Sequence, residues 1–126
     1  MIRTGSFLLV AWILSSGLAE GSEVRDLLYY DGPDRDDQKH RLDLYLPDSK
    51  SPAPVLMFIH GGGWKFGDRW QYPLLGRQMA KRGFACAVIS YRLSPGVKHP
   101  EHIKDCARAF AWLYRNVAKY GGDPQQ

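Results

Sequence analysis

The chain has 126 residues, enough for one domain but not for several. It is 44% hydrophobic and 24% charged, which is the composition of an ordinary globular protein and not of a disordered one. The formal charge of +4 is spread along the chain without a basic block, so nothing favours nucleic acid as a partner. We therefore expect a globular domain with a mixed, solvated surface.

The beginning of the chain differs in character from the rest. Arg3 precedes an apolar run at 7–14, and a small-x-small pattern ends at Ala19. A basic start, a short apolar core and such a site are typical of a secretory signal peptide, and a membrane span would need about 20 apolar residues. We expect a signal peptide over 1–19, cleaved after Ala19, and hence a secreted or periplasmic protein with no stable membrane span. A buried first helix or an uncleaved anchor is the alternative.

Two strand patterns joined by a turn follow the cleavage site. Residues 24–30 can form a strand, and 31–37, rich in Asp, Gly and Pro, form a turn. From His40 to Leu46, leucines alternate with polar or aromatic residues, which is the period-2 signature of a half-exposed strand. We expect these two strands to pair as an antiparallel hairpin at a sheet edge.

Apolar strands and helices alternate in the remainder. The runs 55–59 and 84–89 are apolar throughout, as expected for strands covered on both faces. Residues 70–82 and 101–120 predict helices, each followed by glycine. The order β-β-β-α-β-α predicts an α/β fold, a three-layer sandwich with a mostly parallel sheet. The apolar stripe expected on the second helix consists of Ile103, Cys106, Ala107, Phe110, Leu113, Tyr114 and Val117.

The two cysteines, Cys86 and Cys106, fall in an apolar strand and on that helical stripe. An exported protein could join them, whereas a buried free cysteine is a common core residue, so the sequence leaves a disulfide open. The cysteines and the four histidines match no zinc spacing. We expect neither a metal nor an organic cofactor.

Three consecutive glycines occur within His60-Gly61-Gly62-Gly63-Trp64, directly after an apolar strand. Glycine is costly to order, so it is used where the backbone must turn sharply or approach another group closely. Amide N–H groups exposed in this way can receive a developing oxyanion, and one such donor can lower a barrier by about 3 kcal/mol. The spacing fits neither a Walker loop nor a dinucleotide fingerprint, although a plain flexible turn remains the alternative.

Four motifs in a fixed order place this stretch in a known framework. They cover most of the chain from about Arg41 to Pro124, which resembles an α/β-hydrolase of the hormone-sensitive-lipase-like and BD-FAE-like carboxylesterases. The resemblance implies that 20–126 form the N-terminal part of an α/β-hydrolase domain. The motifs are Leu44-Tyr45-Leu46-Pro47; the glycine stretch with Gly67-Asp68; Ser90-Tyr91-Arg92-Leu93-Ser94-Pro95 with His99-Pro100; and Asp105, Ala109, Trp112 and Leu113 followed by Tyr120-Gly121-Gly122-Asp123-Pro124.

The resemblance assigns roles to the glycine stretch. In that family the amides of the second and third glycines line the oxyanion hole, which implies Gly62 and Gly63 here. His60, together with Gly61, is similar to the loop support, although a plain buried histidine at a strand end is nearly the same reading. Trp64 is similar to a wall of the acyl or alcohol pocket, with core packing as the alternative.

Three charged residues have structural roles in this interpretation. Asp68 is expected to cap the following helix, to hold Arg92 or Lys65, or to remain a solvated carboxylate. Arg92 and Asp105 are expected to pair beneath the loop. None of the three is assigned a catalytic role.

The nucleophile of the family is missing from the sequence given. It sits in a Gly-x-Ser-x-Gly turn, and no such pentapeptide occurs here. Family order places the nucleophilic serine, and the later Asp/Glu and His, beyond Gln126. Ser90 and Ser94 lack a glycine elbow, so we interpret them with His99 and His102 as loop and cap residues, not as a makeshift triad.

These features predict the lineage of a serine hydrolase that cleaves a small-molecule or polysaccharide carboxylic ester through an acyl-enzyme in the complete protein. An inactive truncated or degenerate hydrolase fold that acts as a binding protein is the alternative, and a peptidase shares the same framework. The fourth strand, 84–89, is expected to end the sheet with an open apolar edge, which is an aggregation hazard. We therefore expect the chain alone to be poorly stable or to need another chain.

Overall fold

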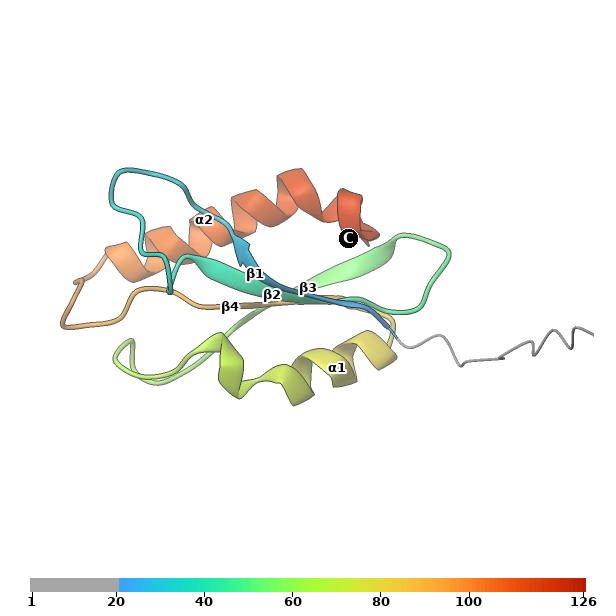
Figure 1. Cartoon of the computed structure of the whole chain (residues 1–126), viewed down its shortest axis with the longest axis horizontal. Helices are drawn as coiled ribbons and strands as arrows, with labels where there is room; N and C mark the ends of the chain where they lie inside the picture. Colours follow the sequence, from blue (N-terminus) through green and yellow to red (C-terminus); the bar gives the residue numbers. More distant parts are fainter. Residues whose placement is uncertain (1–20) are drawn as a thin grey trace, which may run out of the picture.

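A computed structural model describes residues 21–126, so the signal peptide expected over 1–19 lies outside the described residues. A five-stranded sheet forms the middle layer, with helix α1 on one face and helix α2 on the other (Figure 1). This confirms the predicted three-layer α/β sandwich. The elements are β1 (Glu23–Leu28), β2 (Arg41–Tyr45), β3 (Ala53–Ile59), η1 (Arg69–Gln71), α1 (Pro73–Lys81), β4 (Ala85–Ile89), α2 (Glu101–Asn116), η2 (Val117–Tyr120) and β5 (Gly122–Asp123).

The strands are ordered β1-β2-β4-β3-β5 across the sheet. β1 pairs antiparallel with β2, as the predicted hairpin requires, and it forms one edge of the sheet. β2 pairs antiparallel with β4, whereas β4 with β3 and β3 with β5 are parallel pairs. The sheet is therefore mixed, with an antiparallel half formed by the hairpin and a parallel half that contains β3.

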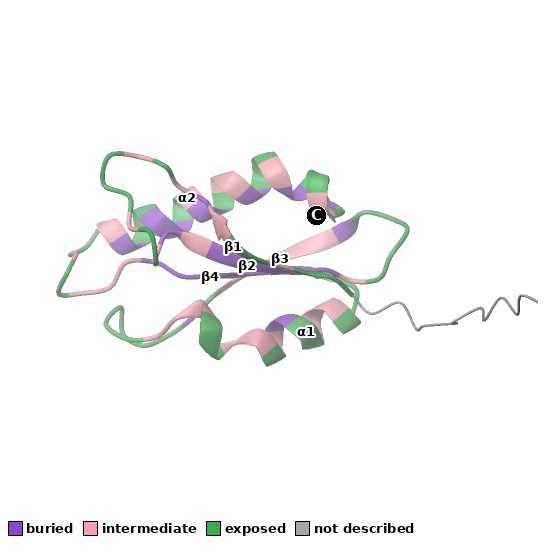
Figure 2. Cartoon of the chain, viewed as in Figure 1, coloured by how far each residue is buried: buried purple, intermediate pink, exposed green. Residues whose placement is uncertain are grey.

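β4 lies at the centre of the sheet and not at its edge, so the expectation that the fourth strand ends the sheet is wrong. Its five residues are fully buried, because β2 and β3 pair with its two edges and a helix covers each face (Figure 2). The open edge belongs to β3, which pairs with β5 only at Ala53 and Pro54. Most β3 side chains are accordingly only half-buried.

The side chains of β4 alternate between two hydrophobic clusters. Ala85, Ala87 and Ile89 face the α2 side with Leu42 and Leu44 of β2 and Leu113 of α2. Cys86 and Val88 face the α1 side, where Leu75 and Met79 of the helix pack on them. This alternation is the period-2 geometry of a strand, so β4 contributes side chains to the hydrophobic clusters on both faces of the sheet.

β2 is buried on both faces, so the prediction of a half-exposed strand is wrong. Asp43 is 3% exposed and Tyr45 is 1% exposed. Asp43 accepts hydrogen bonds from the amide of Asp26 and from the guanidinium of Arg69. A Cβ on Gly76 of α1 would lie 2.2 Å from the Tyr45 ring, so glycine is what allows the helix to approach. The period-2 pattern identified the strand but could not show that residues on its second face are covered by α1 and, for Asp43, have hydrogen-bond partners.

Both predicted helices are divided in the structure. The pattern at 70–82 becomes η1 and α1, and the break falls before Pro73, which lacks an N–H and suits the first turn of a new helix. The second helix passes from α2 into η2 and ends at Gly121, which has φ +92°. No helix within residues 21–126 combines the length and the apolar character that a bilayer crossing requires.

The predicted stripe on α2 is only partly correct. Cys106, Leu113 and Val117 are buried, but three large members of the stripe, Ile103, Phe110 and Tyr114, are 51%, 61% and 57% exposed. The buried face instead includes the polar residues His102 and Asp105. His102 and Asp105 have hydrogen-bond partners on neighbouring loops, so this face of the helix packs toward the sheet. The apolar face that carries Ile103, Phe110 and Tyr114 is therefore exposed.

Cys86 and Cys106 are both free and buried. They belong to different clusters on opposite faces of the sheet, which excludes a disulfide between them in this structure. Burial raises the pKa of each thiol to about 11.

Candidate functional site

The glycine stretch forms a loop at the carboxyl end of β3. The segment that follows β4 lies at the same end, because β3 and β4 are parallel. The two loops are joined directly: the Ser94 amide donates a hydrogen bond of 2.8 Å to the carbonyl of Trp64. Crevices at the carboxyl ends of parallel strands are the usual ligand sites of α/β sheets.

The backbone turns through three consecutive positive φ values, +124° at Gly62, +61° at Gly63 and +63° at Trp64. A Cβ on Gly62 would lie 2.2 Å from the carbonyl oxygen of Phe66, so both space and conformation require glycine there. Gly63 needs glycine for its conformation alone. At Gly61 a Cβ would meet no atom within 4 Å, so this position tolerates a side chain.

The Gly62 and Gly63 amides of this turn have no hydrogen-bond partner in the part of the chain that the structure describes. Within residues 21–126, neither the Gly62 N–H nor the Gly63 N–H donates a hydrogen bond, although the Gly62 carbonyl accepts bonds of 3.1 Å from the amides of Lys65 and Phe66. Both glycines are exposed. The N–H groups of Gly61 and Trp64 also donate no hydrogen bond within residues 21–126. The loop therefore presents a run of unused backbone donors at the surface, of which the resemblance assigns Gly62 and Gly63 to the oxyanion, and such donors can receive negative charge.

His60 lies beneath the turn and is 2% exposed. Its Nδ1 lies 2.8 Å from the Gly61 carbonyl oxygen, and its ring stacks on Tyr91 with the centroids 4.4 Å apart. The Tyr91 hydroxyl donates to the His60 carbonyl over 2.6 Å. A Cβ on Gly67 would lie 2.2 Å from Nδ1, so the loop closes tightly over the imidazole. These contacts are those of a residue that supports the loop.

Trp64 is 42% exposed and forms one side of the turn. Its ring lies 5.3 Å from the Tyr91 ring and 5.4 Å from the His102 ring, measured between centroids. The indole is therefore half packed and half accessible, which is the geometry of a wall beside the free amides.

Asp68 and Ser90 connect the glycine loop to η1. Asp68 accepts hydrogen bonds from Lys39 Nζ at 2.6 Å and from the Ser90 hydroxyl at 2.8 Å, and it is the N-cap residue of η1. Burial alone would raise the pKa of Asp68, but the bonds from Lys39 and Ser90 outweigh it and lower that pKa. Asp68 is thus neither solvated nor paired with Arg92 or Lys65, and Ser90 is engaged in the same network.

Arg92 and Asp105 pair as predicted, and the structure adds His40 to the pair. Both carboxylate oxygens of Asp105 accept bonds of 2.9 Å from the Arg92 guanidinium. His40 Nε2 lies 2.9 Å from Asp105 Oδ1, and both side chains are fully buried. Burial would raise the pKa of Asp105, but the hydrogen bonds from His40 and Arg92 hold it well below its usual range. The sequence did not indicate that His40 is buried in this pair, because a histidine at the start of a strand could equally be exposed.

Ser94 and His102 are brought together by the fold. Ser94 Oγ lies 2.9 Å from His102 Nε2 and 3.0 Å from the Val97 carbonyl oxygen. His99 is exposed. Among the residues described, no carboxylate is hydrogen-bonded to His102, so the pair lacks the acidic member of a triad.

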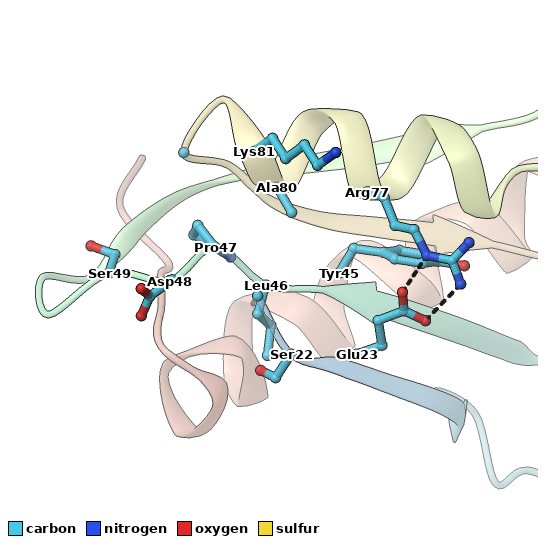
Figure 3. Close-up of a pocket in the computed structure, with 12 residues that line it drawn as sticks. Ser22, Glu23, Tyr45, Leu46, Pro47, Asp48, Ser49, Arg77, Ala80 and Lys81 are labelled. Carbon is cyan, nitrogen blue, oxygen red and sulfur yellow. Dashed lines mark hydrogen bonds and ion pairs between the residues drawn. The ribbon is translucent and has the colours of Figure 1, made fainter. Parts of the chain in front are cut away.

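Two cavities lie away from the loop. One of about 710 Å³ is at the opposite end of the sheet, between α1 and the end of β2, where Arg77 pairs with Glu23 (Figure 3). The other, of about 230 Å³, is an apolar groove between α2 and the open edge of β3. No residue of the glycine stretch lines either cavity. In the described part of the chain, no three His, Cys, Asp or Glu side chains are grouped to hold a metal ion.

Comparisons with known proteins agree with this geometry. Residues 42–126 match the BD-FAE family model. The chain is 38% identical over 104 residues to the Probable isoprenylcysteine alpha-carbonyl methylesterase ICME of Oryza sativa subsp. japonica, a match that covers 82% of this chain and 24% of that protein. It is 46% identical over 74 residues to Esterase LipC of Mycobacterium tuberculosis, which covers 57% of this chain and 18% of that protein.

The fold is also similar to a solved enzyme. Esterase B from Lactobacillus rhamnosis superimposes with a TM-score of 0.74 at 29% sequence identity, covering 83% of this chain and 34% of that one. The chain thus spans about a fifth to a third of the length of these relatives. The chain corresponds to one part of such a protein. Because the family model covers most of residues 21–126, including the glycine loop, the chain belongs to the BD-FAE family of α/β-hydrolase carboxylesterases.

Proposed function

We propose that this chain supplies the oxyanion loop of a carboxylic-ester hydrolase. The observation that carries the proposal is the pair of amides at Gly62 and Gly63, exposed and without a hydrogen-bond acceptor within residues 21–126. Two N–H groups aimed at one point stabilise the negative charge that develops on a carbonyl oxygen under attack, and this stabilisation is the largest single contribution in many acyl-transfer enzymes. His60 and Gly61 support the loop, and Trp64 borders the acyl or alcohol portion of the substrate.

The complete reaction runs through an acyl-enzyme. A serine attacks the ester carbonyl, a histidine takes its proton and later gives it to the leaving alcohol, and water then releases the acid. The Gly62 and Gly63 amides hold the oxyanion in both tetrahedral intermediates. The groups needed for proton transfer and attack come from beyond Gln126 in this proposal, on strands that continue the sheet from the open edge of β3.

The substrate we propose is a small-molecule or polysaccharide carboxylic ester. The esterase names of the relatives support the ester bond, and an exported location would suit an extracellular ester. We propose that residues 1–19 direct this export. Terminal sequencing of the protein secreted by its host tests that part, because a mature chain that begins at Glu20 is expected and a retained Met1 would contradict it.

The coding DNA after the codon for Gln126 provides the direct test. A Gly-x-Ser-x-Gly turn within a few dozen codons, in frame or after a frameshift, is expected. Unrelated sequence there would count heavily against a hydrolase lineage that is still functional.

An inactive hydrolase fold that serves as a binding protein is the second candidate. It is favoured by the engagement of both serines near the loop, since Ser90 is bonded to Asp68 and Ser94 to His102 and Val97. Incubation of the 126-residue chain with a fluorophosphonate probe and p-nitrophenyl acetate separates the possibilities. Neither labelling nor turnover is expected of the chain alone, whereas a labelled serine would eliminate the binding-protein candidate and would show that the nucleophile lies within the chain.

A further inference from the structure

The turn that presents the free amides is held from one side by the segment after β4. Trp64 has φ +63°, a conformation that a bulky side chain rarely adopts and that persists only where surrounding contacts fix it. The bond from the Ser94 amide to the Trp64 carbonyl, 2.8 Å long, is the backbone contact that fixes it. Ser94 therefore holds the turn from outside, in addition to the Lys65 and Phe66 amides, which bond to the Gly62 carbonyl within the turn.

Ser94 is in turn held by its side chain. Its hydroxyl lies between the Val97 carbonyl at 3.0 Å and His102 Nε2 at 2.9 Å. A carbonyl only accepts, and a hydroxyl has a single proton to donate. Both hydrogen bonds therefore form together only when the hydroxyl donates to Val97 and His102 carries its proton on Nε2 and donates to the hydroxyl.

His102 contacts the turn by a second route as well. It is 4% exposed, it lies in the first turn of α2, and its ring is 5.4 Å from the indole of Trp64. The imidazole thus touches Trp64 through the side chain and holds the Trp64 carbonyl through Ser94. A buried polar residue on the rigid end of a helix is well placed to fix a loop that must not relax.

We propose that His102 is a positioning residue for the glycine turn: it donates to Ser94, and Ser94 holds Trp64 in the left-handed conformation that directs the Gly62 and Gly63 amides outward. The link between His102 and the turn is structural. Its meaning for catalysis rests on the proposed oxyanion function.

The same distance of 2.9 Å would also suit a nucleophile and its general base. Two observations favour the positioning role: the Val97 carbonyl offers the Ser94 hydroxyl an acceptor at 3.0 Å, and no carboxylate orients His102 within the described residues. Reaction of Ser94 with a fluorophosphonate probe would reverse this assignment and overturn the proposal.

Amide hydrogen exchange measured by NMR on the full chain tests the positioning role. The reporters are the amides of Ser94, Lys65 and Phe66, whose hydrogen bonds close the turn. His102→Ala is expected to speed their exchange about fivefold relative to the amides of β4, which is the effect of one lost hydrogen bond. His102→Gln keeps an N–H donor at a similar reach and is expected to restore slow exchange.

Leu113→Ala is the matched control. Leu113 lies on the same helix and is 3% exposed, but it packs between α2 and the sheet in a cluster that includes no residue of the glycine stretch. It is expected to lower the melting temperature and to speed exchange throughout the chain without singling out the three reporters. The proposal is overturned if His102→Ala leaves the reporters unchanged in a folded chain, or if it changes them no more selectively than Leu113→Ala does. Failure to find a nucleophile downstream would remove the catalytic meaning and leave the exchange result intact.

Discussion

The two edges of the sheet are finished in opposite ways. On the hairpin side, polar groups close the structure: Tyr29 donates to the Ser90 carbonyl over 2.7 Å, and His40 reaches Asp105 beneath it. On the β3 side, the strand is left with a short partner, and Phe110 and Tyr114 project from α2 beside an apolar groove. On the hairpin side, the chain covers its own interior. On the β3 side, apolar side chains of the kind usually found in a core lie at the surface.

The largest effect is expected at the buried ion pair on the closed side. Asp105→Ala leaves the buried His40 Nε2 without its acceptor and leaves Arg92 with only its outer partners, Glu101 and Asp34. Removal of one partner of a buried pair costs about 3–5 kcal/mol. We expect the chain to lose its cooperative unfolding transition in circular dichroism. Asp37→Asn serves as the control, because the Asp37 side chain is 65% exposed and pairs only with Arg35. A folded Asp105→Ala chain with an unchanged midpoint would show that the closed edge does not depend on this pair.

The lowered pKa of Asp105 predicts how the stability of the chain depends on pH. The pKa of Asp105 is below its usual range in the folded chain and about 3.9 in an unfolded one. Its contribution to stability is therefore complete above about pH 4 and is lost as the pH falls further toward the folded pKa. Urea midpoints measured between pH 7 and pH 3 are expected to decline mainly below pH 4. A midpoint that declines mainly between pH 7 and pH 5 would contradict this assignment.

Substitutions at two positions on α2 compare its buried face with its exposed apolar face. Leu113→Ser places a hydroxyl in the core and removes a buried leucine, for which we expect a loss of about 2–5 kcal/mol. Phe110→Ser, three residues earlier and 61% exposed, is expected to change the free energy of unfolding by no more than about 0.5 kcal/mol and to increase the monomeric fraction in analytical ultracentrifugation. If Phe110→Ser destabilises the chain as much as Leu113→Ser, the uncovered face is part of the core.

The glycine loop allows a narrower comparison within one motif. Gly62→Ala forces a Cβ against the Phe66 carbonyl at a positive φ, and we expect a cost of about 1–3 kcal/mol together with loss of the turn. Gly61→Ala is the matched control, with open space around its Cβ and an expected change within about 0.5 kcal/mol. In a form of the protein that includes the nucleophile, kcat for p-nitrophenyl butyrate is expected to fall at least tenfold for the first variant only. Equal kcat values for the two variants would argue against an oxyanion role.

The smallest effect is expected for the ion pair between Arg77 and Glu23 on the hairpin side of the sheet. Arg77 and Glu23 join α1 to β1, and both side chains are partly exposed (Figure 3). Exposed pairs contribute at most about 1 kcal/mol, and salt weakens them. Thermal melts of Arg77→Ala at low and high ionic strength are expected to differ from the native chain only at low salt. A large shift at both would mean that this pair is part of the structural frame.

The sequence predicted the strands more fully than the way in which they pair and are buried. Alternating leucines located β2, and uniform apolar runs located β3 and β4, because strand periodicity depends only on side-chain direction. Which strand ends the sheet could not be predicted in this way, since β3 and β4 have the same apolar pattern and differ only in their pairing. The displaced stripe of α2 has a related cause: His102 and Asp105 are buried because residues outside the helix hydrogen-bond to them, whereas periodicity treats both as solvent-facing.

The glycine motif of the candidate site was predicted, whereas its contacts with the segment after β4 were not. The glycine stretch, with His60 and Trp64, stood out because three glycines in succession have no role in a regular element. Ser94 and His102 were assigned to a loop and a cap, and nothing in their spacing indicates a shared hydrogen bond. The Arg92–Asp105 pair followed from the family framework, whereas His40 joins it through a fold contact 65 residues away in sequence.

The placement of Cys86 and Cys106 on opposite faces of β4 gives the molecule two built-in chemical reporters, one for each helical layer. Because burial keeps both thiols protonated at neutral pH, each reacts with a disulfide reagent only when its own layer separates from the sheet. Two reaction rates measured on the unmodified chain would therefore show whether the α1 and α2 layers come apart together or one after the other.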